Sequence, residues 1–526
     1  MDFIRRPLRH VFLLSEAVLD KVFGPAWNPL YHLGALGFFH YWIVAVTGIY
    51  VYVFFETSVS EAYLSVEAIT HEQWYLGGVM RSLHRYASDA LVLMMAVHIL
   101  REFAMDRYRG ARWFTWFTGV PILWLVTISG VTGYWLVWDM LAQYVAVTTS
   151  EWLDSLPIFG ELIAGNFLTP DSLDSRFFTL MVFLHIAVPL ILLLVLWIHL
   201  QRVSRPKINP PRGLAVGTFI AMLALALVKP ALSQGPADLA SVPTVLGIDW
   251  FYLPVYPLLD VMSGQSLWAL VLIASLILAV LPWMPPMRRR PAAEVHLDNC
   301  NGCARCVEDC PFNALSLVPR TDGAPFSHEA KVDPKLCISC GICAGACPTS
   351  MPFRRATPLV AGIELPDLTM ATLRDRVDTA TAALQGDARV LVFGCDYGAP
   401  VRGLAGPGTA VISLPCIAML PPAYIDYALS KSRADGVVLA GCREGGCNAR
   451  FGQRWTEARL AGTRDPHLRA RVPRRRLLVA PAGPADRRKL AAEVAAFAAR
   501  LTSLPAEEPP APPARLAAAV DATKEA

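Results

Sequence analysis

The chain has 526 residues, of which 54% are hydrophobic and only 17% are charged. This composition is typical of a membrane protein, and the length allows about three domains. The formal net charge of +4 is small for such a length and argues against a nucleic-acid partner.

The N-terminus mixes basic and apolar residues, as a secretion signal does. Glu16, Asp20 and Lys21 interrupt its apolar run, however, and no small-residue cleavage site follows. We therefore predict an amphipathic helix that lies on the membrane surface rather than a cleaved signal peptide.

Six segments are long and apolar enough to span a bilayer, which requires about 20 residues. They lie near 31–55, 77–104, 114–138, 177–201, 213–232 and 265–284. The connections 56–80 and 139–175 contain no Lys or Arg. Basic residues crowd the connections after the second, fourth and sixth segments: Arg107, Arg109, Arg112, Arg202, Arg205, Lys207, Arg212, Arg288, Arg289 and Arg290. By the positive-inside rule, this pattern predicts an inner-membrane protein with both termini in the cytoplasm.

Two of the six segments carry a pair of histidines at the same interval. His84 and His98 are fourteen positions apart, and so are His185 and His199. Fourteen residues make about four helical turns, so both rings of a pair leave one face, roughly 21 Å apart. The loop charges place His84 and His185 near the outer membrane face and His98 and His199 near the inner one. Two such helices side by side offer two sites, each with one imidazole from each helix.

A four-helix core holds two b-type haems in this way, with two axial imidazoles for each iron. A single histidine on an apolar helix is usually a satisfied core residue. Matched pairs on two membrane-length segments need another explanation, because ionisable groups at membrane depth are costly. The other seven histidines lack such partners and receive no ligand role: His10, His32, His40, His71, His296, His328 and His467.

Short motifs throughout residues 1–290 resemble those of cytochrome b of the bc-type quinol-oxidising complexes. They are Arg81-Ser82-Leu83-His84, His98 to Arg101, Gly34 and Gly48, Gly119 and Gly133, Arg176-Phe177-Phe178 with Pro189, Ser155 to Glu161, and Asp249 to Pro254. The resemblance implies that His84 and His185 bind an outer haem and His98 and His199 an inner one. It also implies that Arg81 and Arg101 lie near haem propionates and that the chain forms a homodimer. Glycines fit such a site, because a haem can approach the backbone closely only where no Cβ intervenes.

Two positions depart from the family pattern at the outer quinol site. Where the family has Pro-Glu-Trp-Tyr, this chain has Ile248-Asp249-Trp250-Phe251, and where the family has Pro-Trp-Gly it has Val137-Trp138-Asp139. Asp249 and Asp139 are candidate catalytic proton acceptors for a quinol. Each is equally explained as a solvated loop acid.

All twelve cysteines lie at or beyond residue 300, and the first eight follow a repeated spacing. The motif C-x2-C-x2-C-x3-C-P occurs twice, at Cys300, Cys303, Cys306 and Cys310 and at Cys337, Cys340, Cys343 and Cys347. This spacing directs three thiolates to one cluster and the fourth to the other. We therefore predict one [4Fe-4S] cluster on Cys300, Cys303, Cys306 and Cys347, and a second on Cys337, Cys340, Cys343 and Cys310. Two zinc sites are the alternative, but such sites rarely use this spacing. The segment is similar to bacterial two-cluster ferredoxins.

Residues from about 386 onward have the pattern of a small α/β unit. The runs Arg389–Phe393, Ala410–Leu414, Gly436–Ala440 and Arg476–Val479 are expected to be strands, and Pro422–Ser430 a helix. Cysteines follow the first three strands closely: Cys395, Cys416, Cys442 and Cys447. Residues just beyond the ends of parallel strands gather at one edge, so these four thiols are expected to form a metal site. The alternative is four buried, inert cysteines.

The segment Gly441-Cys442-Arg443-Glu444-Gly445-Gly446-Cys447 resembles the delta subunit of methyl-viologen-reducing hydrogenases over roughly 386–460. That resemblance implies a [2Fe-2S] cluster on the four cysteines. A helix is expected near 484–502, followed by a disordered Pro- and Ala-rich tail over 505–526.

The predicted fold is a membrane all-α domain with six transmembrane helices and a di-haem four-helix core, followed by a cytoplasmic α+β ferredoxin domain and a small α/β iron–sulfur domain. The expected boundaries are 1–290 for the membrane domain, 291–357 for the ferredoxin domain, 358–385 for a linker, and 386–504 for the α/β domain.

These sites together predict a membrane electron-transfer subunit of a quinone-linked oxidoreductase. Two b haems, two [4Fe-4S] clusters and finally one [2Fe-2S] cluster would connect the quinone pool to a soluble partner. No nucleotide-binding glycine loop follows a strand, so flavin chemistry is expected on another chain, by analogy a flavoprotein like the heterodisulfide reductase flavin subunit. The alternatives are a non-catalytic membrane anchor and electron conduit with a degenerate quinone site, and a redox sensor, for which no output domain is visible.

Overall fold

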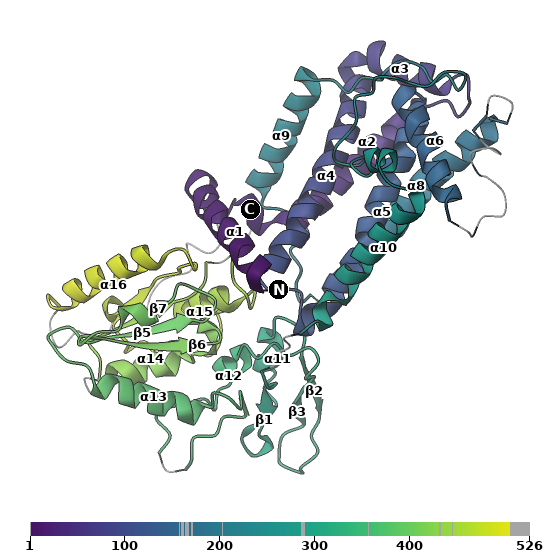
Figure 1. Cartoon of the computed structure of the whole chain (residues 1–526). Coiled ribbons are helices and arrows are strands. Elements are labelled where there is room, and N and C mark those ends of the chain that lie inside the picture. Colours follow the sequence, from purple (N-terminus) through teal and green to yellow (C-terminus); the bar gives the residue numbers. More distant parts are fainter. Residues whose placement is uncertain are drawn as a thin grey trace.

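The computed structural model describes residues 2–156, 158, 163, 168–169, 172–201, 203–285, 290–355, 357–430, 433–443 and 445–504. Several predicted features lie outside these ranges: most of the 157–161 part of the family motif, Arg202, Arg288, Arg289, Glu444 and the tail over 505–526. Figure 1 shows an elongated molecule with a bundle of long helices at one end and a mixed α/β body at the other.

Long apolar helices build the first half of the chain. The described elements are α1 (Asp2–Phe23), α2 (Leu33–Phe54), α3 (Ala62–His71), α4 (Val79–Ala104), α5 (Trp113–Val137), α6 (Met140–Asp154), α8 (Ser175–Leu200), α9 (Arg212–Val228) and α10 (Gly264–Val280). Within this bundle, α2 packs along α4 and α5 packs along α8. These two pairs form the four-helix core in which the predicted histidines lie.

Helices occupy all six predicted membrane segments, but among the described residues only four meet both length and apolarity criteria for a span. They contain α2, α5, α8 and α10, and α9 is a shorter apolar helix. The helix α4 is long enough but carries Arg81, Arg85, Asp89, Arg101 and Glu102. The chain is therefore a multi-pass membrane protein, while the count of six spans remains a prediction.

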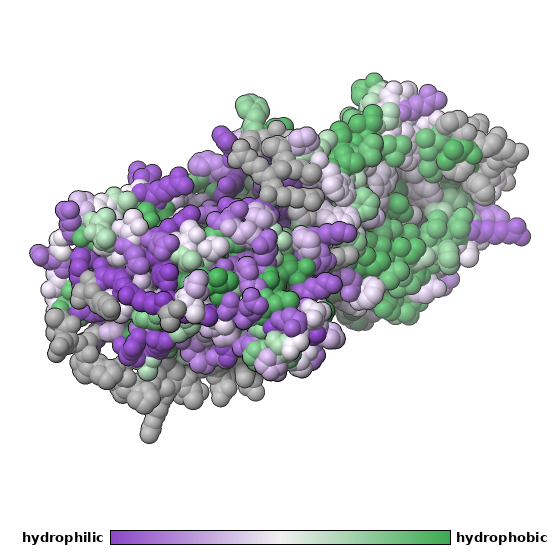
Figure 2. Space-filling view, turned by 90° about the horizontal axis from the view of Figure 1, so that it is seen from below, coloured by the Kyte–Doolittle hydropathy of each residue, from purple (hydrophilic) through white to green (hydrophobic). Residues whose placement is uncertain are grey.

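Figure 2 shows hydrophobic residues concentrated over the helical bundle and hydrophilic residues over the α/β body. Exposed apolar side chains on α8, such as Phe183, Leu190 and Trp197, would lie in water if this part were soluble. A contiguous apolar surface of this kind fits a lipid environment. On α1, the exposed apolar residues Phe3, Val11 and Val18 agree with a helix at the membrane surface.

Two short helices in equivalent places shape the ferredoxin domain. They are α11 (Arg305–Asp309) and α12 (Ile342–Ala346), and each contains the third cysteine of its motif. The antiparallel strands β2 (Leu315–Pro319) and β3 (His328–Val332) form a hairpin, and β1 (Glu294–Val295) pairs with β4 (Ile363–Glu364). The left-handed residues Ala304 and Gly341 precede α11 and α12 and turn the backbone around the cysteine loops.

A four-stranded parallel sheet with the order β6-β5-β7-β8 organises the α/β domain. Its strands are β5 (Val390–Cys395), β6 (Thr409–Leu414), β7 (Gly436–Ala440) and β8 (Leu477–Val479). The flanking helices are α13 (Met370–Ala382), α14 (Pro422–Leu429), α15 (Gly452–Ala461) and α16 (Arg487–Leu501). The parallel sheet, its four strands and two of its helices agree with the sequence-based expectation.

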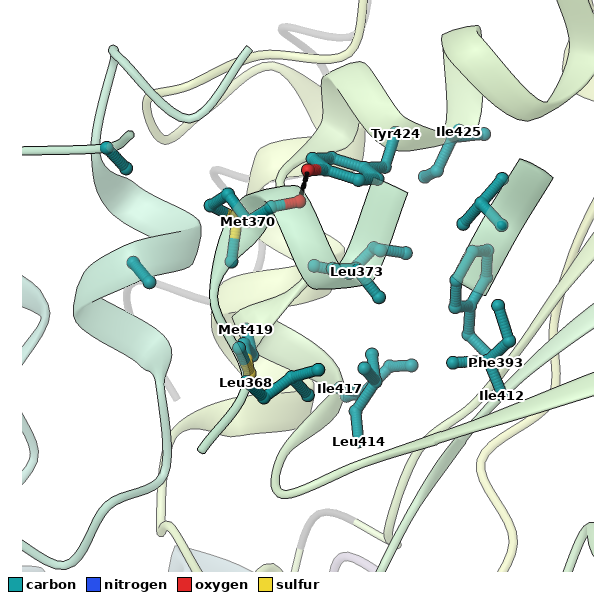
Figure 3. Packing of buried hydrophobic residues seen from close by; sticks show 14 of the residues in the cluster. Leu368, Met370, Leu373, Phe393, Ile412, Leu414, Ile417, Met419, Tyr424 and Ile425 are labelled. Atoms are coloured by element: carbon teal, nitrogen blue, oxygen red, sulfur yellow. Dashed lines mark hydrogen bonds between the residues drawn. The ribbon is translucent and has the colours of Figure 1, made fainter. Parts of the chain in front are cut away.

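The segment 358–385, expected to be a linker, contains β4 and the whole of α13 in the structure. Leu373 and Val377 of α13 are fully buried, and Figure 3 shows Leu373 among core residues that include Phe393 and Ile412. The hydroxyl of Tyr424 on α14 donates to the carbonyl of Met370 in the same core. The apolar positions of α13 recur at helical spacing, so the segment joins the ferredoxin and α/β domains into one packed body.

Candidate functional site

The outer histidine pair faces across the middle of the four-helix core. His84 extends from α4 and His185 from α8, and their ring centroids are 6.2 Å apart with planes inclined at 66°. A metal–imidazole nitrogen bond is about 2 Å long, and the ring centre lies about 1 Å beyond the nitrogen, so two axial rings on one iron should be about 6 Å apart. The two rings therefore fit one iron between them.

The second nitrogen of each outer histidine already has an acceptor. The Nδ1 of His84 lies 2.9 Å from the carbonyl oxygen of Val44, and the Nδ1 of His185 lies 2.9 Å from that of Ser129. A carbonyl can only accept, so Nδ1 must carry the hydrogen and Nε2 is left with its lone pair. Metal-binding histidines commonly donate the N–H of their other ring nitrogen to a backbone carbonyl, which fixes the tautomer and the orientation of the ring.

The inner pair lines a cavity at the other end of the core. His98 of α4 and His199 of α8 both contribute to the wall of this cavity, which has a volume of about 420 Å³. The volume lies in the range of cofactor sites. The hydroxyl of Thr118 lies 2.9 Å from Nδ1 of His199. Most of the wall is apolar, as a haem requires, and its polar members include Arg101 and Glu102.

Each of the four predicted glycines faces one of the four histidines. A Cβ at Gly48 would lie 2.8 Å from Cε1 of His84, and one at Gly133 would lie 2.7 Å from Cε1 of His185. At the inner level there is more room: a Cβ at Gly34 would lie 3.8 Å from Cε1 of His98, and one at Gly119 would lie 3.7 Å from Cε1 of His199. The outer glycines are thus required by the histidine rings themselves, whatever else approaches them.

This difference predicts unequal effects of alanine at equivalent positions. We expect Gly133→Ala to lower the content of outer haem, because its methyl group would collide with the His185 ring. The matched change Gly119→Ala should retain close to the full haem content, because its methyl group would lie at ordinary contact distance from His199. The ratio of b-type absorbance to protein in the two purified variants measures both. Equal losses would mean that Gly119 makes room for the porphyrin as well.

Three threonines beside these glycines were missed by sequence reasoning. Thr47 and Thr132 each lie 3.3 Å from Nδ1 of an outer histidine, and Thr118 contacts His199. The signal is visible in the sequence, because a Thr-Gly pair occurs at 47–48, 118–119 and 132–133. The hydroxyls add a second oxygen beside the histidine nitrogen that the metal does not use.

The two arginines predicted to lie near propionates have different surroundings. Arg101 is buried, donates to the Glu16 carboxylate of α1 at 2.7 and 2.9 Å, and borders the inner cavity. Arg81 instead hydrogen-bonds Ser233 at 2.8 Å and lies 3.5 Å from the Glu67 carboxylate. Arg101 is thus placed beside the inner site, whereas Arg81 is engaged by carboxylate and hydroxyl groups outside the core.

The two candidate proton acceptors also differ. Asp139 is the N-cap of α6, where its oxygens accept from the backbone N–H groups of Ala142 at 2.8 Å and Gln234 at 2.9 Å. Burial raises its pKa. These contacts give Asp139 a structural role, because a capping side chain satisfies the free N–H groups at a helix start.

Asp249 belongs to a buried polar network. Its Oδ2 accepts from Arg85 at 2.9 Å and from the hydroxyl of Tyr134, and its Oδ1 accepts from the N–H of Phe251 at 2.8 Å. Arg85 also pairs with Asp89 on α4. Asp249 is therefore the carboxylate with charged and phenolic partners inside the helical core. Arg85, Asp89 and Tyr134 were not identified from sequence, since the Arg85–Asp89 pair of α4 meets Tyr134 of α5 and Asp249 only when these segments pack.

The first predicted cluster set meets in one small cavity of the ferredoxin domain. Cys300, Cys303, Cys306 and Cys347 all line it, although Cys347 belongs to the other motif. Burial, and then the neighbouring thiols of Cys347, Cys303 and Cys300, raise the pKa of Cys306 to about 12. Thiols that resist ionisation on their own fit a site where iron displaces the protons.

The second predicted set also combines three cysteines of one motif, Cys337, Cys340 and Cys343, with the last cysteine of the other, Cys310. Burial raises the pKa of Cys340 to about 12, and the thiols of Cys310, Cys337 and Cys447 add to the effect. Cys310 is thus close to the cysteines of the Cys337 motif. Cys340 also packs against the buried cluster that contains Cys447, so the second ferredoxin set adjoins the four-cysteine site of the α/β domain.

The four cysteines of the α/β domain are buried together at the carboxyl ends of its strands. The Sγ atoms of Cys395 and Cys442 are 3.3 Å apart, and both cysteines are buried with Cys416 and Cys447 in one cluster. Sulfur–sulfur hydrogen bonds with Cys416 and Cys442 hold the pKa of Cys447 well below its usual range. Across the described ranges, no three His, Cys, Asp or Glu side chains enclose a single-ion position. The four thiols nevertheless lie together as the ligands of a small cluster would.

Three segments of the chain match known family models. Residues 18–205 match cytochrome b/b6/petB, residues 299–351 match a 4Fe-4S dicluster domain, and residues 399–505 match the delta subunit of methyl-viologen-reducing hydrogenase. These matches lie in the three regions for which the sequence motifs predicted haem, [4Fe-4S] and delta-subunit-like sites. The first ends before Asp249, and the third begins after Cys395.

Individual relatives match the membrane half. Cytochrome b6 of Porphyra purpurea is 30% identical over 203 residues, which are 38% of this chain and 92% of that protein. Cytochrome b6 of Prochlorothrix hollandica is 30% identical over 203 residues and is covered to 89%. Among solved structures, a hyperthermophilic respiratory Complex III chain has 18% sequence identity and a TM-score of 0.40, with 48% of this chain and 75% of that chain covered.

Proposed function

Because this chain belongs to the cytochrome b family, we propose that it carries electrons between the quinone pool and a soluble flavoprotein or dehydrogenase partner. The family match and the two iron–sulfur domains make it a membrane electron-transfer subunit of a respiratory-type complex.

The main support for this proposal is that the two histidine pairs lie at two levels of one four-helix core. His84 and His185 would hold one haem b, and His98 and His199 the other, each supplying its Nε2 atom. The cysteine sets would hold two [4Fe-4S] clusters and one [2Fe-2S] cluster. These groups supply one-electron redox chemistry at separate depths. The protein fixes their positions and orients the histidine rings through Val44, Ser129 and Thr118.

The balance of the reaction is set by the quinone. A quinol loses two electrons and two protons when it becomes a quinone, and each site in the protein accepts one electron at a time. In this proposal Asp249 would take up or release a quinol proton, which is supported by its buried carboxylate beside Arg85 and Tyr134. The soluble partner takes or supplies the same number of electrons.

One observation favours a second candidate function, a non-catalytic anchor and conduit. Both oxygens of Asp249 already have donors, from Arg85, Tyr134 and the Phe251 N–H group. A carboxylate that is fully satisfied by the protein has less need of a substrate proton. In this candidate, the soluble partner would dock on the membrane subunit, and the quinone site would be inactive.

Haem reduction by a soluble quinol analogue distinguishes the two candidates, and replacing Asp249 by asparagine tests its part in the first. If Asp249 exchanges a proton with quinol, Asp249→Asn should slow haem reduction by a soluble quinol analogue about 100-fold, a typical loss for a proton-transfer group. Asp139→Asn is the matched control, expected to leave that rate unchanged because Asp139 caps α6. Stopped-flow measurement of the b-type absorbance gives both rates. An unchanged rate in Asp249→Asn would refute Asp249 as the proton acceptor. No haem reduction by the quinol analogue in the unmodified protein would establish the conduit function instead.

A further inference from the structure

The four-cysteine site of the α/β domain lies directly against the inner histidine site. Cys447 lines the same 420 Å³ cavity as His98 and His199, together with Gly445, Arg450 and Phe451. Cys442 lines a second, smaller cavity, which also touches Arg101 on α4. Two of the four thiols therefore face the membrane domain, although the chain places them more than 200 residues after its last membrane-domain histidine.

Several arginines connect the loop over residues 443–450, which contains Cys447, to the membrane domain. Arg107, just after α4, donates to the carbonyl of Gly446 at 2.7 Å, and Arg112 donates to the Asn448 side chain at 3.1 Å. From the other side, Arg450 donates to the backbone carbonyl of Arg205 at 3.1 Å, and Arg443 pairs with Asp20 on α1. The arginine donors belong to the membrane domain and to the α/β domain alike, and their contacts are charge-assisted. They hold the α/β domain against the end of the helical bundle that contains His98 and His199.

The same four thiols adjoin the ferredoxin domain on their other side. Cys340 of the second ferredoxin motif packs with Ile338 against the buried cluster that contains Cys395 and Cys416. Trp455 of α15, in that cluster, donates through Nε1 to the carbonyl of Asp309 on α11 at 3.3 Å. The four-cysteine site is thus enclosed between the inner haem site and the second ferredoxin site.

The first ferredoxin set lies farther along and reaches solvent. All twelve cysteines fall within the described ranges, and among them only Cys303 is exposed. Its cavity is lined by Gly302, Leu317 and Ala330 of the ferredoxin domain, with no residue from the membrane half. Cys395, Cys416, Cys442 and Cys447 are all buried.

We propose that the four-cysteine site is the internal junction of the molecule, and that the ferredoxin site of Cys303 is the end of the series of sites that faces solvent. The proposal rests on the electron-transfer function proposed above and changes the order of the sites. The sequence order predicts that the α/β domain meets the partner last. In space the order is the outer histidines, the inner histidines, the four-cysteine site, the Cys337 set and the Cys300 set. Each transfer along it oxidises one site and reduces the next by one electron.

The order can be tested by depth, without turnover. A dysprosium–EDTA complex in solution accelerates the electron-spin relaxation of paramagnetic centres near the protein surface. We would reduce the full-length protein in lipid nanodiscs and record the relaxation of each iron–sulfur signal with and without this complex. Signals are assigned with Cys442→Ser for the four-cysteine site and Cys303→Ser for the first ferredoxin site.

We expect several-fold faster relaxation for the signal lost in Cys303→Ser and almost none for the signal lost in Cys442→Ser. The double change Arg107→Ala and Arg450→Ala, which removes docking contacts but no ligand, should make the second signal sensitive to the complex. Arg433→Ala is the control, because Arg433 binds Asp378 inside the α/β domain. Equal sensitivity of the two wild-type signals would overturn the proposed order.

The outcome is separable from the fate of the proposed function. A protein that shows both haems and its ferredoxin signals, but in which the four-cysteine signal is strongly relaxed, would keep the electron-transfer function and lose the junction. If Cys442→Ser removed no signal from such a protein, the junction would likewise be refuted. A protein without b-type absorbance would instead refute the proposed function.

Discussion

Replacing His84 with leucine is expected to halve the b-type absorbance of the purified protein. His84 and His185 face each other with ring centroids 6.2 Å apart, so the outer haem would lose one of its two axial ligands. Leucine fills a similar volume in the apolar helix without a nitrogen donor, which keeps the packing of α4 largely intact. The haem-to-protein ratio, measured by pyridine haemochrome absorbance, should fall from two to one.

Double variants test which histidines share a haem. His84→Leu with His185→Leu should lose no more haem than either single change, because both ligands serve the same site. His84→Leu with His98→Leu should lose both haems. His40→Leu is the matched control: His40 is also buried on a core helix, but its Nδ1 bonds the Leu36 carbonyl at 2.7 Å within α2. Two haems retained in His84→Leu would contradict the assignment of the outer pair.

Much of the membrane half could be predicted because helical periodicity and lipid impose strong rules. The fourteen-residue interval of the histidines, repeated in the glycines, fixes which faces of α2, α4, α5 and α8 must meet. The structure puts each glycine against one histidine, as that interval requires. The number of spans was harder to predict, because α4 carries charges that the core neutralises and that composition alone cannot place.

Contacts between distant segments could not be predicted from local patterns. Asp249 and Asp139 were equivalent candidates in the sequence, and only packing separates a network with Arg85 from a cap on α6. The ferredoxin spacing predicted that Cys347 joins the first three cysteines of the Cys300 motif, and these four cysteines line one cavity. The position of the α/β domain against the inner histidines has no local signal, because it depends on arginines in loops hundreds of residues apart.

Removing the carboxylate of Asp309 is expected to destabilise the iron–sulfur half strongly. Asp309 on α11 is buried and pairs with Arg464 and with Arg459 on α15, and Arg459 is only 1% exposed. Arg459 also donates to the carbonyl of Ala418 at 2.7 Å, so this pair joins the ferredoxin and α/β domains. Asp309→Ala would leave a buried guanidinium without its carboxylate, a change that typically costs about 3–5 kcal/mol. The urea midpoint for bleaching of the iron–sulfur absorbance in the full-length protein measures the loss.

A second change should recover part of that stability. In Asp309→Ala with Arg459→Leu, the fully buried guanidinium is removed together with its carboxylate, and only the partly exposed Arg464 keeps its charge there. Well-packed apolar replacements of buried ion pairs are often neutral. The double variant is therefore expected to bleach at a higher urea concentration than Asp309→Ala alone. Glu493→Ala, which breaks an exposed pair with Lys489 on α16, should cost less than about 1 kcal/mol and serves as the control. If the double variant were weaker than the single, the cost would come from lost packing at the domain junction rather than from the unpaired charge.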